Sequence, residues 1–162
     1  MGITDQEKAE SRPQPPMIAL DLGEKRVGVA VSDPLAISIT RLAALPRSNW
    51  KQLLRDVVDL VQRFDAKTVV IGLPLRLDGS NGDAAIEIRN IASKFARSLS
   101  VPVYLQDERL SSVEAEQNLR LDGHAAQKVR ELVDSEAAAV ILRDFFVSNQ
   151  DRVPVSPAEQ TL

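Results

Sequence analysis

Two apolar segments on either side of a single acid constrain the fold of this chain most strongly. Residues 17–20 and 27–31 are apolar, and Asp21 follows the first of them directly. The pattern predicts a β-hairpin with a glycine-containing tight turn over residues 23–25. Two cations adjoin the acid: Lys25 and Arg26. Because an acid at the rim of a core is costly unless a cation compensates it, the hairpin favours a metal or phosphate site.

The length, charge and composition narrow the class of protein. A chain of 162 residues is long enough for one domain that buries about two thirds of its unfolded surface. The net charge of −3 argues against binding of nucleic acid through overall charge, so any such binding would need a local basic patch. The absence of Cys excludes disulfides and thiolate metal sites, and 4% aromatic residues give poor support to a base-stacking surface.

Both ends of the chain are polar and contain several prolines. We expect disordered tails over residues 1–16 and 149–162, with one globular domain over residues 17–148. The N-terminal stretch lacks the apolar region of a secretory signal, and no segment approaches the length of a membrane span. The expectation is a cytoplasmic protein that does not contact a membrane.

Between the tails, helical and strand patterns alternate. Apolar residues at 3.6-residue spacing predict a helix over residues 50–64 with Asn49 as its N-cap, and a second helix capped by Asp83. A capping box at residues 111–114 predicts a third helix, and a last helix is expected to start near Asp134. Further strands are expected over residues 38–45, 67–73 and 101–106.

This order of elements predicts the fold class. Three strands joined as hairpins precede an alternation of helices and strands. Such an order is typical of an α/β fold with a mixed sheet and helices on both faces.

Three carboxylates stand at the ends of expected elements. Asp21 closes the first strand, Glu108 follows the last strand and Asp134 opens the last helix. Sites in open α/β sheets gather at strand ends, so these acids can converge. Carboxylates without His or Cys suit Mg²⁺ or Mn²⁺, and two such ions can clamp the attacking and leaving oxygens of a phosphodiester displacement. The three acids are therefore candidate metal ligands and catalytic residues.

Each of these acids also has a purely structural interpretation. Asp21 could be a turn residue, Asp134 could be an N-cap, and Glu108 could pair with Arg109 at a solvated strand end. Asp107 and Glu108 point to opposite faces of an extended strand, so only one of them faces Asp21. Periodicity alone leaves open which one it is.

Basic residues near the acids are candidates for phosphate contacts. They are Lys25, Arg26, Arg76, Arg109, Lys128 and Arg130. Since Lys and Arg are usually solvated surface residues, the best candidates are the three that adjoin the acids, namely Lys25, Arg26 and Arg109. The only histidine, His124, follows Gly123 in a polar stretch and is expected to be solvated rather than catalytic.

Four segments of the chain match the pattern of one family. They are DLGEKRVGVAVSD at 21–33, VIGLPLRLDGS at 70–80, DERLSS at 107–112, and Lys128 followed by Asp134, Ala137, Ala138, Ile141 and Leu142. In this order and spacing, over roughly residues 17–146, they resemble the YqgF family of small bacterial proteins, also called RuvX. Ser112 stands where the family often has Thr, and both residues can cap a helix.

The resemblance implies a ribonuclease H-like fold and a nuclease site built from Asp21, Glu108 and Asp134. It also selects Glu108 over Asp107. Family members are described as candidate nucleases that mature the 5′ end of pre-16S ribosomal RNA, and their likeness to Holliday-junction resolvases suggests branched DNA as another substrate. The implied partners are pre-rRNA or branched DNA and the ribosomal particle, for a monomer or a homodimer.

Three hypotheses of different classes follow. The leading one is a Mg²⁺- or Mn²⁺-dependent endonuclease in which Asp21 anchors the metal and Glu108 and Asp134 complete its shell. In this hypothesis Lys25, Arg26 and Arg109 hold phosphates. The second is a non-catalytic rRNA maturation factor whose acids no longer act. The third is an ATP-handling protein, because Asp-x-Gly after a strand also opens a phosphate loop, but that class needs a second domain and a second Gly-rich loop, which this chain lacks.

Overall fold

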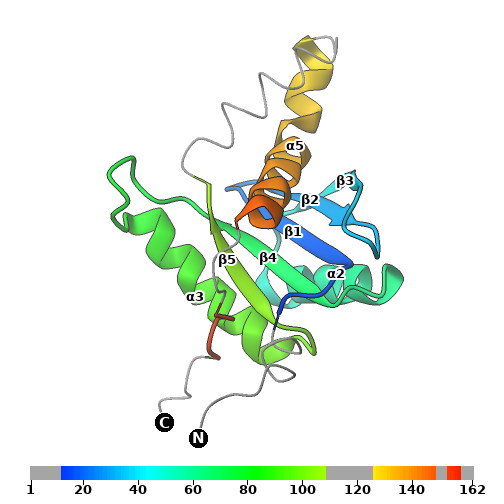
Figure 1. Ribbon diagram of the computed structural model, residues 1–162. Coiled ribbons are helices and arrows are strands. Elements are labelled where there is room, and N and C mark those ends of the chain that lie inside the picture. Colours follow the sequence, from blue (N-terminus) through cyan, green and yellow to red (C-terminus); the bar gives the residue numbers. More distant parts are fainter. Residues whose placement is uncertain (1–11, 109–125, 149–152, 158–162) are drawn as a thin grey trace, which may run out of the picture.

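A computed structural model describes residues 12–108, 126–148 and 153–157, with side chains described from Ser135 onward in the second range (Figure 1). Within these ranges, five strands form one sheet in the order β3-β2-β1-β4-β5. The strands are β1 (Met17–Leu22), β2 (Arg26–Ser32), β3 (Ile39–Pro46), β4 (Thr68–Leu73) and β5 (Val103–Asp107).

The directions of the strands make the sheet mixed. β2 runs antiparallel to both of its neighbours, β1 and β3. β4 runs parallel to both β1 and β5. The three predicted antiparallel strands and the two strands that follow helices are therefore confirmed as parts of one sheet.

Helices cover both faces of this sheet, as predicted (Figure 1). α2 (Trp50–Arg63) and α3 (Asp83–Ser98) pack on one face, and α5 (Ala126–Val147) packs on the other. The predicted cap of α2 is confirmed, because Asn49 Oδ1 accepts a hydrogen bond of 2.9 Å from the Gln52 N–H. No helix of the described ranges combines the length and the hydropathy that a membrane span requires.

Two predicted helix starts are wrong. α3 has Gly82 at its N-cap position without a side-chain cap, and Asp83 is the first residue of the helix, where its charge still favours the positive end of the helix dipole. α5 begins at Ala126, so Asp134 lies inside the helix and is not its N-cap. The helix predicted from residues 111–114 lies outside the described residues.

The early start of α5 has a physical reason. Its first part consists mainly of strong helix formers such as Ala, Gln, Lys, Arg, Glu and Leu, but it lacks a continuous apolar stripe. In Figure 1 this part, in yellow, projects beyond the sheet edge at which β5 ends. The apolar run that locates the helix in the sequence begins only where the helix packs on the sheet.

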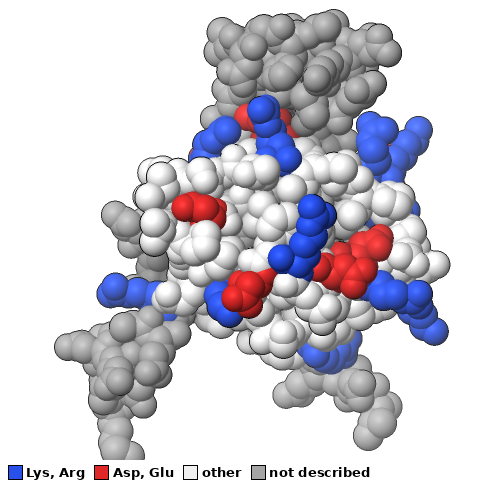
Figure 2. Space-filling view, turned by 90° about the vertical axis from the view of Figure 1, so that its right-hand side faces the viewer, with Lys and Arg blue, Asp and Glu red and all other residues white. Residues whose placement is uncertain are grey.

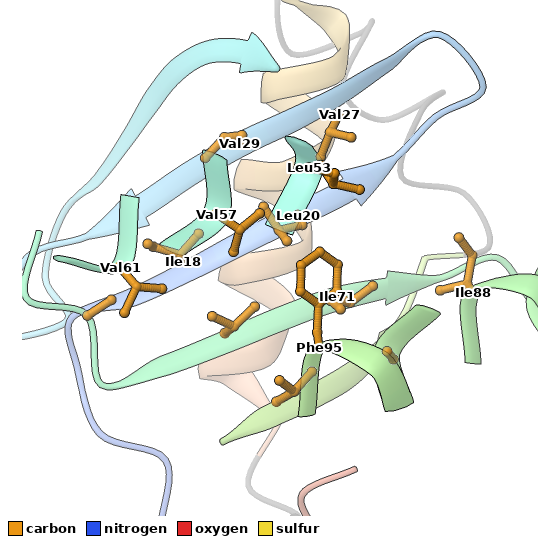
Figure 3. Close-up of a cluster of buried hydrophobic side chains, with 14 of the residues drawn as sticks. Ile18, Leu20, Val27, Val29, Leu53, Val57, Val61, Ile71, Ile88 and Phe95 are labelled. Carbon is orange, nitrogen blue, oxygen red and sulfur yellow. The ribbon is translucent and has the colours of Figure 1, made fainter. Parts of the chain in front are cut away.

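Alternation along the strands divides the core into two layers. Ile18 and Leu20 of β1 face α2 and α3, in the cluster drawn in Figure 3, whereas Met17 and Ala19 face α5. Residues of one face recur every second position in a strand, so each face can be followed along β4 and β5 in the same way. Full burial of a Val, Leu, Ile, Phe or Met side chain contributes about 1.5–3 kcal/mol, and both layers contain several such residues.

The described parts of the two chain ends make hydrogen bonds to the sheet. The backbone N–H of Gln14 donates to Thr68 Oγ1 at 3.1 Å, and the Lys67 N–H donates to the Pro16 carbonyl at 2.8 Å. Val155 donates its N–H to the Val103 carbonyl at 2.7 Å and packs against the core on the α2–α3 side. The rest of both predicted tails lies outside the described residues.

Candidate active site

The carboxyl ends of the three parallel strands meet at one edge of the sheet. β1 ends one residue after Asp21, and Glu108 follows β5 directly. The Glu108 N–H donates to the Leu73 carbonyl at 3.1 Å, which holds the residue beside the end of β4. Both acids of the predicted site that the structure describes in full therefore lie at the edge where α/β sheets collect their ligands.

The alternation of side chains decides between Asp107 and Glu108. Tyr104 of β5 packs in the layer under α5, so residues 106 and 108 follow on that face. Val103 and Leu105 pack in the opposite layer, which is the face of Asp107. In β1, Asp21 follows Ala19 on the α5 face. Asp21 and Glu108 thus share a face, and Asp107 lies on the other; the role of Glu108 stays a prediction.

Gly72 of β4 provides the space for the Glu108 carboxylate. A Cβ placed on Gly72 would lie 2.6 Å from Glu108 Oε2, 2.7 Å from Glu108 Cδ and 2.5 Å from Ile141 Cδ1. The carboxylate therefore lies over the glycine and next to α5. Sequence reasoning treated this strand as an uninterrupted apolar run and missed Gly72, although glycine inside a strand is a signal of close approach.

The strand register places Asp21 in a row of residues across the sheet. Asp21 pairs with Gly28 of β2, and Gly72 pairs with Gln106 of β5. Leu20 pairs with Ile71, so Asp21 and Gly72 occupy the next level of the same ladder. Asp21 is half-buried between two positions that carry no side chain. On the α5 side of this row, the Glu108 carboxylate and Ile141 lie over Gly72, which brings Glu108 to the level of Asp21.

The third predicted acid, Asp134, lies in α5. It precedes Ala138 by four residues and Ile141 by seven, and both of these residues pack in the layer between α5 and the sheet. Its side chain lies outside the described part, so its role stays a prediction. Among the side chains that the structure does describe, no three His, Cys, Asp or Glu residues form a group able to hold a metal ion.

The turn between β1 and β2 presents two of the predicted basic residues. Lys25 and Arg26 are both exposed there. The Gly23 N–H donates to the Asp21 carbonyl at 3.1 Å and to the Arg26 carbonyl at 3.0 Å, which closes the turn. A Cβ on Gly23 would lie 2.7 Å from the Arg26 carbonyl oxygen, so the turn requires glycine. The closed turn thus presents the two cations at the end of β1 that carries Asp21.

Arg47 fixes this turn to the rest of the molecule. Its Nη1 donates to the Gly23 carbonyl at 2.8 Å, and its own N–H donates to the Lys25 carbonyl at 2.9 Å. Its Nη2 also pairs with Glu87 Oε1 of α3 at 3.2 Å. Sequence reasoning missed Arg47, because nothing in the pattern distinguishes it from a solvated arginine.

The other predicted phosphate-binding residues are less well defined. Arg76 is exposed in the loop after β4, and its Nε would lie 3.1 Å from a Cβ on Gly82, so the side chain lies at the N-terminus of α3. Arg109 lies outside the described residues. Lys128 and Arg130 belong to α5, but their side chains are not among those described.

Acidic and basic side chains are interspersed on the face that Figure 2 shows. On the described part of this face, blue and red residues alternate with large uncharged areas and form no continuous basic patch. Binding of phosphates on this face would therefore depend on individual Lys and Arg side chains rather than on the overall charge of the protein.

A buried ion-pair cluster fastens α5 to β3 close to Asp134. Glu136 is only 1% exposed, and its carboxylate pairs with Arg41 Nη1 at 2.7 Å and with Arg143 Nη1 at 3.2 Å. Ser135 Oγ donates to the Leu42 carbonyl at 2.6 Å. The cluster was not predicted, although a glutamate within the apolar part of the last helix was a signal. It fixes the helix residues that directly follow Asp134.

Comparison with known proteins supplies an independent result. The family model described as "RuvX: Holliday junction resolvase" matches residues 16–148. A protein of Syntrophus aciditrophicus (strain SB) named "Putative pre-16S rRNA nuclease" is 35% identical over 139 residues, which cover 85% of this chain and 93% of that protein. A protein of Anaeromyxobacter sp. (strain Fw109-5) with the same name is 40% identical over 129 residues, covering 80% and 94%.

A solved structure shows the same fold at much lower identity. The Thermus thermophilus RuvC protein in complex with a Holliday junction substrate matches with a TM-score of 0.52 and 15% identity, over 85% of this chain and 98% of that chain. This likeness confirms the predicted ribonuclease H-like mixed sheet. The match of the family model to most of the chain, together with relatives of 35% and 40% identity, shows that this chain belongs to the RuvX family.

Proposed function

We propose that this RuvX-family nuclease uses a divalent metal ion to cleave phosphodiester bonds at the 5′ end of pre-16S ribosomal RNA. The observation that carries the proposal is the placement of Asp21 and Glu108 on one face of the sheet, at the carboxyl ends of β1 and β5, the two parallel strands on either side of β4. Processing of pre-rRNA would take place in the cytoplasm, on or near the ribosomal particle.

The donor set fits Mg²⁺ or Mn²⁺. Both acids supply hard carboxylate oxygens, and the described part of the site contributes no imidazole, which suits these ions. Gly28 faces Asp21 without a side chain, and the Glu108 carboxylate takes the position over Gly72 in the same row. Asp21 and Glu108 would hold the ion, and Asp134 of α5 would complete the set. When bound, the ion supplies charge stabilisation and activates water for attack on the phosphate.

The residues of the chain have distinct roles in this proposal. The carboxylates hold their position because β1, β4 and the contact with Ile141 fix them before substrate binds. Lys25 and Arg26 lie exposed in the adjoining turn and would contact backbone phosphates of the substrate. Arg47 would act as a positioning residue, since it holds the turn that carries them.

The names of the curated relatives support ribosomal RNA as the substrate. These relatives match over more than nine tenths of their own length and are named for pre-16S rRNA. The second candidate is cleavage of a four-way DNA junction, which the description of the family model favours. A two-fold symmetric junction would require a homodimer, whereas a monomer suffices for trimming of RNA.

A cleavage assay on both substrates tests the proposal. The purified protein and Asp21→Asn are incubated with end-labelled pre-16S rRNA 5′ fragment and with a synthetic four-way DNA junction, in Mg²⁺, Mn²⁺ or EDTA. We expect metal-dependent cutting of the RNA by the wild type and none by Asp21→Asn. Cutting of the junction alone would establish the second candidate. Binding of RNA without cutting under any condition would favour a non-catalytic maturation factor.

A further inference from the structure

We propose that Gln106 is a neutral oxygen donor of the same cation site, beside Asp21 and Glu108. The inference rests on the proposed metal-dependent function and adds a residue that neither the sequence pattern nor the relatives assign. It concerns the Oε1 atom of the side-chain amide, which would face the bound divalent ion.

The register of the sheet places Gln106 at the site. It pairs with Gly72, the glycine over which the Glu108 carboxylate lies. It follows Tyr104 by two residues, so it belongs to the α5 face of β5. Asp21, Gly72 and Gln106 therefore form one row across three neighbouring strands. The glycine in the middle has no side chain, and the Glu108 carboxylate lies over it in the same row.

The hydrogen bonds of Gln106 are incomplete. Its Oε1 is buried and has no hydrogen-bond partner among the described residues. Its Nε2 donates only to the Asp107 carbonyl, at 3.5 Å, which is the outer limit for such a bond. Buried carbonyl oxygens are nearly always paired, so an unpaired one in the row of Asp21 and two residues before Glu108 indicates a partner shared with these acids.

A divalent cation is the partner that fits this oxygen. No protein donor among the described residues satisfies Oε1. The two acids that share its face of the sheet, Asp21 and Glu108, accept hydrogen bonds and do not donate them when ionised. Amide and carboxylate oxygens are both hard ligands that Mg²⁺ and Mn²⁺ accept. One cation would thus satisfy the amide oxygen and compensate the two acids together.

Binding of Mn²⁺ to variants of the full chain tests the inference without any nuclease assay. The affinity is measured by titration of the electron paramagnetic resonance signal of free Mn²⁺, and the unfolding midpoint is measured with and without Mn²⁺. The variants are Gln106→Leu, which removes the amide, and Gln106→Glu, which adds a charge. The matched control is Ser48→Ala, because Ser48 Oγ is the other buried oxygen without a partner in the described part and belongs to none of the site elements.

The inference makes opposite predictions for the two variants. Gln106→Leu should weaken Mn²⁺ binding about tenfold, whereas Gln106→Glu should strengthen it. Without metal, Gln106→Leu should unfold at or above the wild-type temperature, since it removes an unsatisfied buried oxygen. Its stabilisation by Mn²⁺ should be smaller than that of the wild type, and Ser48→Ala should respond to Mn²⁺ as the wild type does.

Two other outcomes separate this inference from the proposed function. If the wild type binds Mn²⁺ in a manner that Asp21→Asn abolishes, but both Gln106 variants bind as the wild type does, only the inference on Gln106 is wrong. If the wild type binds no Mn²⁺, the metal-dependent function and the inference are both wrong. Should Gln106→Leu fail to fold, Gln106→Glu decides alone, and an unchanged or weaker affinity overturns the inference.

Discussion

The carboxylate of Glu108 lies directly over the backbone of Gly72, where a Cβ would come within 2.6 Å of Oε2. The contact joins the residue after β5 to the interior of β4, so the acid does not extend into solvent. It also brings the carboxylate against Ile141 of α5. The geometry of the proposed site thus depends on the absence of one side chain from a buried strand.

Gly72→Ala should therefore impair both the site and the fold. The new methyl group would overlap Glu108 and Ile141, and such overpacking costs about 1–3 kcal/mol. The cleavage rate should fall by more than the loss of folded protein explains, because the Glu108 carboxylate must move. Urea denaturation and cleavage rates measure the two effects. Gly82→Ala is the control, since its Cβ would meet only the flexible Arg76 side chain at 3.1 Å. Wild-type cleavage by Gly72→Ala would contradict the assigned position of Glu108.

Arg41→Met should destabilise the protein by about 2–3 kcal/mol. Loss of a partner from a buried ion pair typically costs about 3–5 kcal/mol, but here Arg143 still pairs with the buried Glu136. Arg143→Met should cost less, because its distance of 3.2 Å is longer than the 2.7 Å of Arg41 and its side chain is half exposed. Urea denaturation of both variants ranks the contributions of the two ion pairs to stability. Equal stability of Arg41→Met and the wild type would show that the Arg41–Glu136 pair contributes nothing.

Asp65→Gly should stabilise α2. Asp65 follows the helix with φ of 49°, and the Ala66 N–H donates to the Val61 carbonyl at 2.9 Å, as in a Schellman motif. Glycine adopts this conformation without strain, so we expect a gain of about 0.5–1 kcal/mol in thermal or urea unfolding. The lost ion pair with Lys67 joins exposed groups and contributes little. Lys67→Ala, as a control, should leave the stability unchanged. A loss of stability in Asp65→Gly would contradict the left-handed, helix-terminating conformation assigned to Asp65.

The pH dependence of stability should include a contribution from Asp33. Hydrogen bonds from the backbone N–H groups of Ser38 and Ile37 to its carboxylate hold the pKa of Asp33 below its ordinary value of 3.8. A carboxyl group whose pKa is lower in the folded protein than in the unfolded chain stabilises the fold at pH values above its unfolded-state pKa. This stabilisation is lost as the pH falls through the folded-state pKa. Asp33→Asn should thus melt below the wild type at neutral pH, and the difference should shrink in acid. A constant difference across this range would argue against the ionised carboxylate as the cause.

The sequence predicted the strands and the sheet better than it predicted the helix ends. Strands at 17–20, 67–73 and 101–106 were located within about two residues, because an apolar run between polar turns is a strong local signal. The start of α5 was wrong, since helix formers without an apolar stripe leave no such signal. The cap of α3 was wrong because Asp at the first helical position and Asp at the N-cap give the same pattern.

Contacts in the candidate site between residues that are distant in the sequence could be identified only from the structure. The choice of Glu108 over Asp107 depends on which face of β5 lies under α5, and a helix placed later in the chain determines that face. The roles of Arg47 and Glu136 depend on partners 24 and 95 residues away, respectively Gly23 and Arg41. Local patterns carry no information on such pairs.

The most direct test of the account compares Glu108→Gln with Asp107→Asn. Cleavage of pre-16S rRNA is measured under single-turnover conditions in Mg²⁺, with folding of both variants checked by thermal unfolding. We expect Glu108→Gln to lose about a hundredfold or more in cleavage rate, because a proposed metal ligand is removed. We expect Asp107→Asn, on the opposite face of the sheet, to cleave at close to the wild-type rate. Loss of cleavage in Asp107→Asn with full activity in Glu108→Gln would contradict the account.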